Sequence, residues 1–143
     1  MIHRQALIDT GILVAFYDVA DPHHQQVSKF LSNFRGELIT TISCITETMW
    51  LFASDYRVQN EFLQHLSIQV YRCEILNPED FDRIIELNTQ YSDLPGDFAD
   101  LSLVCISERL GISAIVTLDS DFDIYRRYRN QPFERIFYPN DRD

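Results

Sequence analysis

Hydrophobic and polar positions follow two periods along this chain, one typical of strands and one typical of helices. Short apolar runs bounded by polar residues predict strands that are buried in a sheet. Segments in which apolar residues recur every three or four positions predict helices that pack on a core. The predicted strands cover residues 5–9, 37–41, 70–76, 113–118 and 134–138. The predicted helices lie at or around residues 11–17, 22–34, 44–52, 62–66, 77–87 and 97–110.

The ends of several predicted helices carry residues with specific terminal roles. Asp21 followed by Pro22 predicts a helix start, with Asp21 as the N-cap and proline at the first helical position. Ser43 is expected to cap the helix after the second strand. Gly111 is expected to end the helix over residues 97–110. Strands that alternate with helices in this way indicate βαβ units, and therefore an α/β fold with a parallel sheet covered on both faces.

The composition indicates one folded domain over residues 1–143 with a single hydrophobic core. The 143 residues are 45% hydrophobic and 13% aromatic, which is enough to build such a core. No apolar run approaches the length of a membrane span, and Met1–Gln5 lacks the apolar stretch of a signal peptide. We therefore expect a cytoplasmic protein that does not enter a membrane. The three cysteines have no CxxC or CxxH spacing, which argues against a zinc site and predicts buried, reduced thiols.

The charge balance bears on the class of partner. The formal net charge is −10, which is unfavourable for a general nucleic-acid binder because such proteins usually present a basic face. It does not exclude a nuclease, since clustered metal-binding acids inflate the negative count and bound cations reverse the local sign. The balance predicts weak unspecific affinity for RNA, or a basic partner.

Four carboxylates lie where a predicted strand ends or a helix begins: Asp9, Glu47, Asp100 and Asp119. In open α/β sheets, ligands bind beyond the carboxyl ends of the strands. Asp9 and Asp119 each follow a strand directly, and Glu47 and Asp100 lie within about the first turn of their helices. If the strands are parallel, the topology brings these acids from four distant segments to one edge of the sheet.

Crowded carboxylates repel one another and raise one another's pKa values. Mg²⁺ or Mn²⁺ removes that repulsion and prefers all-oxygen ligands. Such a cation lowers the pKa of a bound water and neutralises charge on a phosphate, which is the chemistry of phosphodiester hydrolysis. We therefore predict that the four acids hold a divalent cation, directly or through water. Thr10, Thr46 and Thr117 are expected to orient the carboxylates or waters by hydrogen bonds.

Each acid also has an ordinary structural explanation. Acids and hydroxyls are preferred at helix N-caps, where they complement the helix dipole. Taken singly, Asp97 or Asp100 is more typical of a helix start than of a metal ligand. These two residues share a helix face, so one can bind a cation while the other caps. Asp121, two residues past Asp119, is either an additional ligand or an exposed turn residue.

Residues 125–129 form the only cluster of basic and aromatic residues in the chain. Arg126, Arg127 and Arg129 follow shortly after Asp119, so they are candidate contacts to single-stranded RNA at the mouth of the site. The alternatives are a surface helix with solvated arginines and a contact with the acidic body of a second subunit.

The four acids, in this order, resemble the PIN-domain family and especially VapC-type toxin ribonucleases. The resemblance runs from Leu7 to about Phe133. No single motif is specific, and the ordered set with its spacing carries the resemblance. The motifs are Asp9-Thr10 at the end of the first strand, Thr46-Glu47 at the start of an early helix, Ala99-Asp100-Leu101 on a central helix, and Thr117-Leu118-Asp119 ahead of Phe122.

The resemblance implies a PIN-like three-layer α/β/α sandwich around a central parallel sheet. It implies a toxin endoribonuclease that depends on Mg²⁺ or Mn²⁺ and cleaves RNA with a metal-activated water. It also implies a homodimer and inhibition by a cognate antitoxin protein. Trp50, Phe52, Phe62 and Leu66 are candidates for a groove that takes an antitoxin helix, although core packing explains most of them.

Two other classes of protein are alternatives to a toxin ribonuclease. A non-catalytic PIN-like binding or scaffold module, in which the acids serve as caps, is the main alternative. A small phosphatase or a receiver-like domain needs a lysine beyond a late strand to contact phosphate. The only lysine in the chain is Lys29, in the second predicted helix, which argues against that class.

Overall fold

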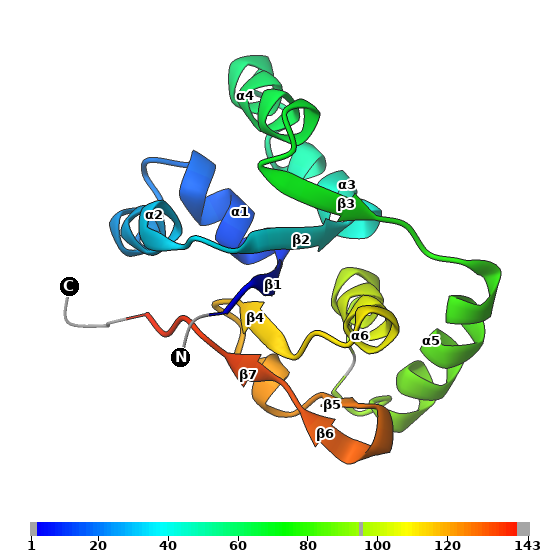
Figure 1. The fold of residues 1–143 in the computed structure, drawn as a ribbon. Coiled ribbons are helices and arrows are strands. Elements are labelled where there is room, and N and C mark those ends of the chain that lie inside the picture. Colours follow the sequence, from blue (N-terminus) through cyan, green and yellow to red (C-terminus); the bar gives the residue numbers. More distant parts are fainter. Residues whose placement is uncertain (1–2, 95, 140–143) are drawn as a thin grey trace.

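A five-stranded parallel sheet forms the centre of the computed structural model, which describes residues 3–94 and 96–139 (Figure 1). The strand order is β3-β2-β1-β4-β7. β1 pairs with β2 on one side and with β4 on the other, so the sheet grows first to one side of β1 and then to the other. The strands are β1 (Gln5–Ile8), β2 (Glu37–Thr41), β3 (Tyr71–Glu74), β4 (Ala114–Val116) and β7 (Glu134–Arg135).

Helices cover both faces of this sheet, which gives the predicted three-layer α/β/α architecture (Figure 1). On one face α1, α2 and α4 pack, and on the other α5 and α6 pack. The helices are α1 (Thr10–Tyr17), α2 (His24–Asn33), α3 (Ile42–Leu51), α4 (Tyr56–Ser67), α5 (Pro78–Gln90) and α6 (Phe98–Leu110). Among the described residues, no helix is long and apolar enough to cross a membrane.

The two cores arise from the alternation of side chains along the central strands. Ala6 and Ile8 of β1 point into the core under α1 and α2, whereas Leu7 between them points into the core under α5 and α6. β4 divides its side chains in the same way. Strands buried on both faces carry apolar residues at every position, which explains why the sequence shows short continuous apolar runs there.

The structure corrects two predicted helix starts. Asp21 accepts a hydrogen bond from the backbone N–H of His23 at 2.8 Å and forms a turn, so α2 begins at His24, two residues later than predicted. Thr41, not Ser43, caps α3, because β2 runs into the helix without a loop and the Thr41 hydroxyl accepts from the N–H of Cys44 at 3.2 Å. Ser43 therefore lies inside the first turn.

The segment after β4 also differs from one expectation. Residues 125–129 do not form a surface helix, since β5 (Arg126–Arg127) pairs antiparallel with β6 (Gln131–Pro132). Arg129 and Asn130 between them adopt positive φ angles of 60° and 62°, which lets the chain reverse direction. Short 3₁₀ helices precede and follow β5: η1 (Ser120–Asp123) and η2 (Tyr128–Asn130).

Other local predictions are confirmed. Gly111 ends α6 with a left-handed φ of 68°. β3 lies at an edge of the sheet, as its alternating pattern predicts. Cys73 on this edge strand is exposed, so the expectation of three buried thiols is wrong for that residue and holds for Cys44 and Cys105.

Candidate active site

A cavity of about 410 Å³ lies at the carboxyl ends of β1 and β4. This is the point where the strand order reverses, which is the usual position of a ligand site in an open α/β sheet. Five acids from four separate segments line the cavity: Asp9, Glu47, Asp97, Asp100 and Asp119. The predicted convergence of acids thus occurs. Among the described residues, the lining includes no lysine, arginine or histidine.

Asp9 follows β1 and caps α1. Its Oδ1 accepts from the backbone N–H of Ile12 at 3.3 Å, and its Oδ2 accepts from the hydroxyl of Thr117 at 2.5 Å. The side chain is only 4% exposed, and burial raises its pKa from 3.8 to about 6. The two hydrogen bonds act in the opposite direction because they stabilise the ionised form. Asp9 is therefore a fixed carboxylate in a site that disfavours its charge.

Asp100 lies in the first turn of α6, three residues after the N-cap. Asp97 is that cap, and its Oδ1 accepts from the N–H of Asp100 at 2.7 Å. Burial, and after it the charges of Asp97, Asp119 and Asp9, raise the pKa of Asp100 from 3.8 to about 8. Asp97 thus caps the helix and also contributes negative charge to the cavity, so its role as a cap is observed and its role as a ligand stays a prediction.

Asp119 and Asp121 lie in the turn after β4. The Oδ1 of Asp119 accepts from the N–H of Asp121 at 2.9 Å, and the N–H of Asp119 donates to the Thr117 hydroxyl at 2.9 Å. Carboxylate oxygens of Asp100, Asp119 and Asp121 lie within 4.8 Å of one another. Burial and then the charge of Asp119 raise the pKa of Asp121. Asp121 therefore lies close enough to join the acidic group.

The three hydroxyls expected to support the site differ in their contacts. Thr117 contacts the Asp9 carboxylate directly. The Thr10 hydroxyl donates to the backbone carbonyl of Cys44 at 3.5 Å, and the Thr46 hydroxyl donates to the carbonyl of Ile42 at 2.8 Å. Thr46 is exposed and returns its hydrogen bond to its own helix. Only Thr117 of these three orients a site carboxylate by a hydrogen bond in the part of the chain that the structure describes.

Tyr125 is a site residue that the motifs did not reveal. Its side chain is completely buried, and its hydroxyl donates to Oδ2 of Asp100 at 3.2 Å. The ring packs edge to face against Tyr91 and Phe122. A Cβ at Gly96 would lie 2.8 Å from the hydroxyl oxygen, so glycine leaves the space that this contact needs. In the sequence Tyr125 belongs to the basic and aromatic cluster, where nothing indicates a contact 25 residues away.

The arginines of that cluster are engaged with the protein itself. Arg127 donates from Nε to the Ser107 hydroxyl at 3.1 Å and from Nη2 to the Ser107 carbonyl at 3.0 Å. Arg126 donates to three backbone carbonyls of the preceding turn, and Arg129 lies over the ring of Tyr128. Arg127 is therefore bound at Ser107, which lies seven residues beyond Asp100 on α6 and about 10 Å from it along the helix axis.

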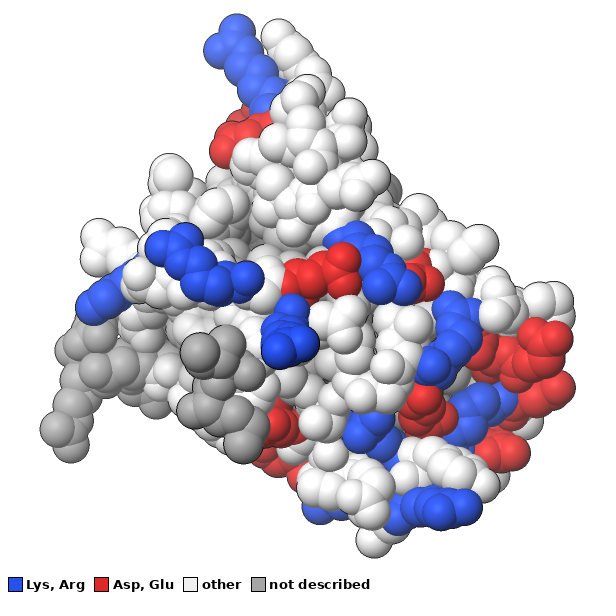
Figure 2. All heavy atoms as spheres, viewed as in Figure 1, with Lys and Arg blue, Asp and Glu red and all other residues white. Residues whose placement is uncertain are grey.

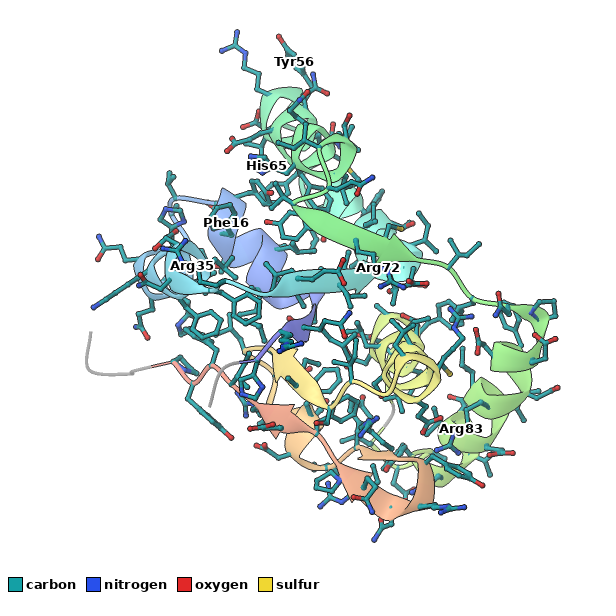
Figure 3. All side chains as sticks on the ribbon, viewed as in Figure 1. Phe16, Arg35, Tyr56, His65, Arg72 and Arg83 are labelled. Atoms are coloured by element: carbon teal, nitrogen blue, oxygen red, sulfur yellow. The ribbon has the colours of Figure 1, made fainter. Side chains whose placement is uncertain are left out.

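Basic and acidic side chains are interspersed over α5 and the surface beside it (Figure 2). Arg83 illustrates the pattern (Figure 3): it forms two hydrogen bonds of 2.9 Å with the carboxylate of Glu108 and a third with Glu86. Arg109 pairs with Asp80 at 3.1 Å. These arginines neutralise local acids, so this face offers little net positive charge to a phosphate backbone.

The donor set fits a hard divalent cation. Carboxylates from four segments face one cavity, and its described lining supplies no positive side chain to balance them. Two of the acids have raised pKa values because they are buried, and a bound cation would favour their ionised forms. All the available ligand atoms are oxygens, the type preferred by Mg²⁺ and Mn²⁺. Within the described residues, neither cysteine nor histidine lines the cavity, which excludes a typical zinc site there.

Comparison with known proteins agrees with this arrangement. The PIN domain family matches residues 6–128. Ribonuclease VapC26 of Mycobacterium tuberculosis (strain ATCC 25618 / H37Rv) is 26% identical over 115 residues, which cover 79% of this chain and 85% of that protein. The crystal structure of Mycobacterium tuberculosis VapC20, a sarcin-ricin loop cleaving toxin, superposes with a TM-score of 0.75.

That superposition covers 83% of this chain and 93% of VapC20, and at 16% identity it shows the shared fold. The family match covers residues 6–128, a range that contains the acids at the ends of β1 and β4 and on α3 and α6. Since it spans most of the 143 residues, the chain belongs to the PIN domain family.

Proposed function

We propose that this protein is an endoribonuclease that hydrolyses RNA phosphodiester bonds with a water activated by Mg²⁺ or Mn²⁺, and that it is the toxin of a toxin–antitoxin pair. The observation that carries the proposal is the cavity lined by five acids without a balancing positive side chain among the described residues. The similarity to a ribonuclease and to a sarcin-ricin loop cleaving toxin supports RNA as the substrate.

In this proposal Asp9, Glu47, Asp100 and Asp119 hold the cation, and Asp97 and Asp121 are additional candidates. When bound, the cation supplies an acidified water and neutralises negative charge on the phosphate. The protein contributes rigidity. Thr117 holds the Asp9 carboxylate, and the caps of α1 and α6 fix the directions of their acids.

Proton release accompanies this role. Asp9 and Asp100 must be ionised to bind a cation, and burial raises the pKa of both. Cation binding at neutral pH therefore displaces protons from the cluster, so affinity should increase with pH. The Tyr125 hydroxyl favours the ionised form of Asp100 because it donates to the carboxylate.

The proposal includes cytoplasmic localisation, a homodimer and a cognate antitoxin as protein partners. Apolar side chains exposed on α3 and α4 support a protein interface, since large apolar groups on a surface often mark one. They include Leu51 at 55% exposure and Leu63 at 41%. Phe62, which was also considered for an antitoxin groove, is fully buried and therefore belongs to the core.

Cleavage of RNA by purified protein tests the proposal. Wild type should cleave in the presence of Mn²⁺ and stop when EDTA is added. Asp9→Ala and Asp100→Ala should reduce cleavage by at least about a hundredfold while circular dichroism shows a folded protein. Asp82→Ala removes an exposed carboxylate on α5 outside the cavity and should leave cleavage unchanged. Cleavage that survives EDTA, or that both site variants retain, would contradict the proposal, and no cleavage by wild type would favour a non-catalytic binding module.

A further inference from the structure

A second cavity, of about 470 Å³, adjoins the acidic one. Glu47 and Asp97 line both cavities, so a ligand at the acids can extend into the second without leaving the surface. The remaining lining consists of the small residues Ser43, Thr46 and Ala99 and two aromatic residues. Of these two, Trp50 comes from α3 and Phe98 from the start of α6. Carboxylates therefore line the first cavity, and aromatic side chains lie next to two of them in the second.

Both aromatic side chains are open to solvent. Trp50 is 76% exposed, so of the four residues considered for an antitoxin groove it is one that core packing does not explain, and Phe98 is 48% exposed. Trp50 lies three residues after Glu47, so the two share one side of α3. Phe98 directly follows Asp97, and its ring stacks on that of Phe81 at 6.4 Å with an interplanar angle of 19°. Each aromatic residue therefore lies beside an acid of the candidate site, and the ring of Phe98 is also held by Phe81.

We propose that Trp50 and Phe98 form a base-binding subsite, in which a nucleotide next to the phosphodiester at the acidic cavity stacks its base on these rings. The occupant is single-stranded RNA. The inference rests on the proposed function for the identity of the substrate, and it adds how that substrate is held.

Charge favours base stacking over backbone contacts at this position. Among the described residues, neither cavity has a lysine or arginine in its lining, and the acids repel unneutralised phosphates. Stacking on aromatic rings supplies affinity without positive charge and tolerates different bases. A duplex is disfavoured because its bases are stacked on each other and are not free to contact a protein ring. An unpaired strand is the form of RNA that suits this surface.

Trp50 provides its own reporter, because it is the only tryptophan in the chain. The Asp100→Asn variant, which should bind without cleaving, is titrated in Mn²⁺ with a short single-stranded oligoribonucleotide, with the same oligonucleotide as a duplex, and with an abasic strand. The single strand should quench Trp50 fluorescence saturably. The duplex and the abasic strand should have a much smaller effect at the same concentrations.

Substitutions separate stacking from other roles. In the Asp100→Asn background, Trp50→Ala should raise the Kd for a labelled single strand about tenfold, and Trp50→Phe should restore most of the affinity. Tyr56→Ala is the matched control, since Tyr56 is 65% exposed at the outer end of α4 and lines neither cavity (Figure 3). It should leave the Kd unchanged.

Three outcomes would overturn the inference. The first is that the single strand binds without quenching and Trp50→Ala keeps the same Kd. The second is that no single strand binds. The third is that Trp50→Ala breaks an oligomer seen by light scattering and has no effect on RNA, which would make this face a protein interface. Binding with quenching but without any cleavage by wild type would support the subsite and overturn the proposed hydrolysis alone.

Discussion

The hydroxyl of Thr117, at the end of β4, donates a 2.5 Å hydrogen bond to the carboxylate of Asp9, at the end of β1. The same oxygen accepts from the N–H of Asp119 at 2.9 Å. One threonine therefore fixes the acid of β1 and the turn that carries the acid after β4. The two acids are 110 positions apart in the sequence and are held together through a single buried side chain.

Replacing Thr117 with valine tests this link, because valine keeps the shape and removes the hydroxyl. Thr117→Val should lower the free energy of unfolding by about 1–3 kcal/mol, since the buried Asp9 carboxylate loses a donor. It should also weaken Mn²⁺ binding by about 10- to 100-fold, as expected when a ligand loses its orienting partner. Urea unfolding and Mn²⁺ titration measure the two effects. Thr117→Ser should recover most of both, and a valine variant with wild-type Mn²⁺ affinity would refute the orienting role.

Tyr125 should control the ionisation of Asp100. Tyr125→Phe removes the hydroxyl that donates to Asp100, and with it an interaction that lowers the pKa of the carboxyl. The acidic limb of the pH profile of Mn²⁺ binding should therefore move to higher pH. Tyr91→Phe is the matched control, because it removes a hydroxyl of the same aromatic cluster that accepts from the N–H of Arg126. A similar shift in both variants would mean that packing, not the carboxylate contact, causes it.

The metal-free protein should lose stability as the pH rises. Asp9 and Asp100 have folded pKa values of about 6 and about 8, above the 3.8 of an unfolded aspartate. Between these values the folded state binds more protons than the unfolded state, so the free energy of unfolding decreases from about pH 4 to about pH 8. Asp100→Asn should reduce this slope and raise the stability at pH 8. Thermal unfolding in EDTA over this range measures it, and an equal slope in both proteins would be inconsistent with the buried charge.

Arg127 should contribute to stability rather than to RNA binding. Arg127→Ala removes two hydrogen bonds to Ser107 and should lower the free energy of unfolding by about 1–2 kcal/mol with little change in RNA affinity. Arg129→Ala, in the exposed turn, should leave stability unchanged. Urea unfolding and RNA titration of the two variants compare these effects. Weaker RNA binding by Arg127→Ala without a loss of stability would instead support the RNA contact that the sequence predicts for Arg127.

Local chemistry made much of the fold predictable. The buried strands appear in the sequence as continuous apolar runs because the sheet is covered on both faces. Leu7 and Ile8, which are neighbours on β1, pack into different cores. The α/β alternation then places Asp9 and Asp119 at one edge of the sheet, which needs only the parallel topology. Gly111 marked the end of α6 because its left-handed φ suits glycine.

Contacts between distant segments were not predictable in the same way. Neither the partner of Tyr125 on α6 nor the partners of Arg127 can be identified from periodicity, since both depend on how the hairpin packs against α6. The helical spacing of Trp50 identifies a side of α3 but does not say whether another element covers that side. Ser43 is a suitable N-cap by residue type, but β2 runs into α3 without a loop, so Thr41 is the N-cap.

Thermal unfolding with and without Mn²⁺ tests the metal centre most directly. A cation that binds only the folded state stabilises it by about 2.7 kcal/mol at a concentration of 100 times its Kd. Wild type, first stripped with EDTA, should therefore gain several degrees in Tm when millimolar Mn²⁺ is added. Asp100→Asn should gain much less, whereas Asp82→Asn on α5 should respond as wild type does. No gain in wild type, or an equal gain in Asp100→Asn, would contradict a cation site formed by these acids.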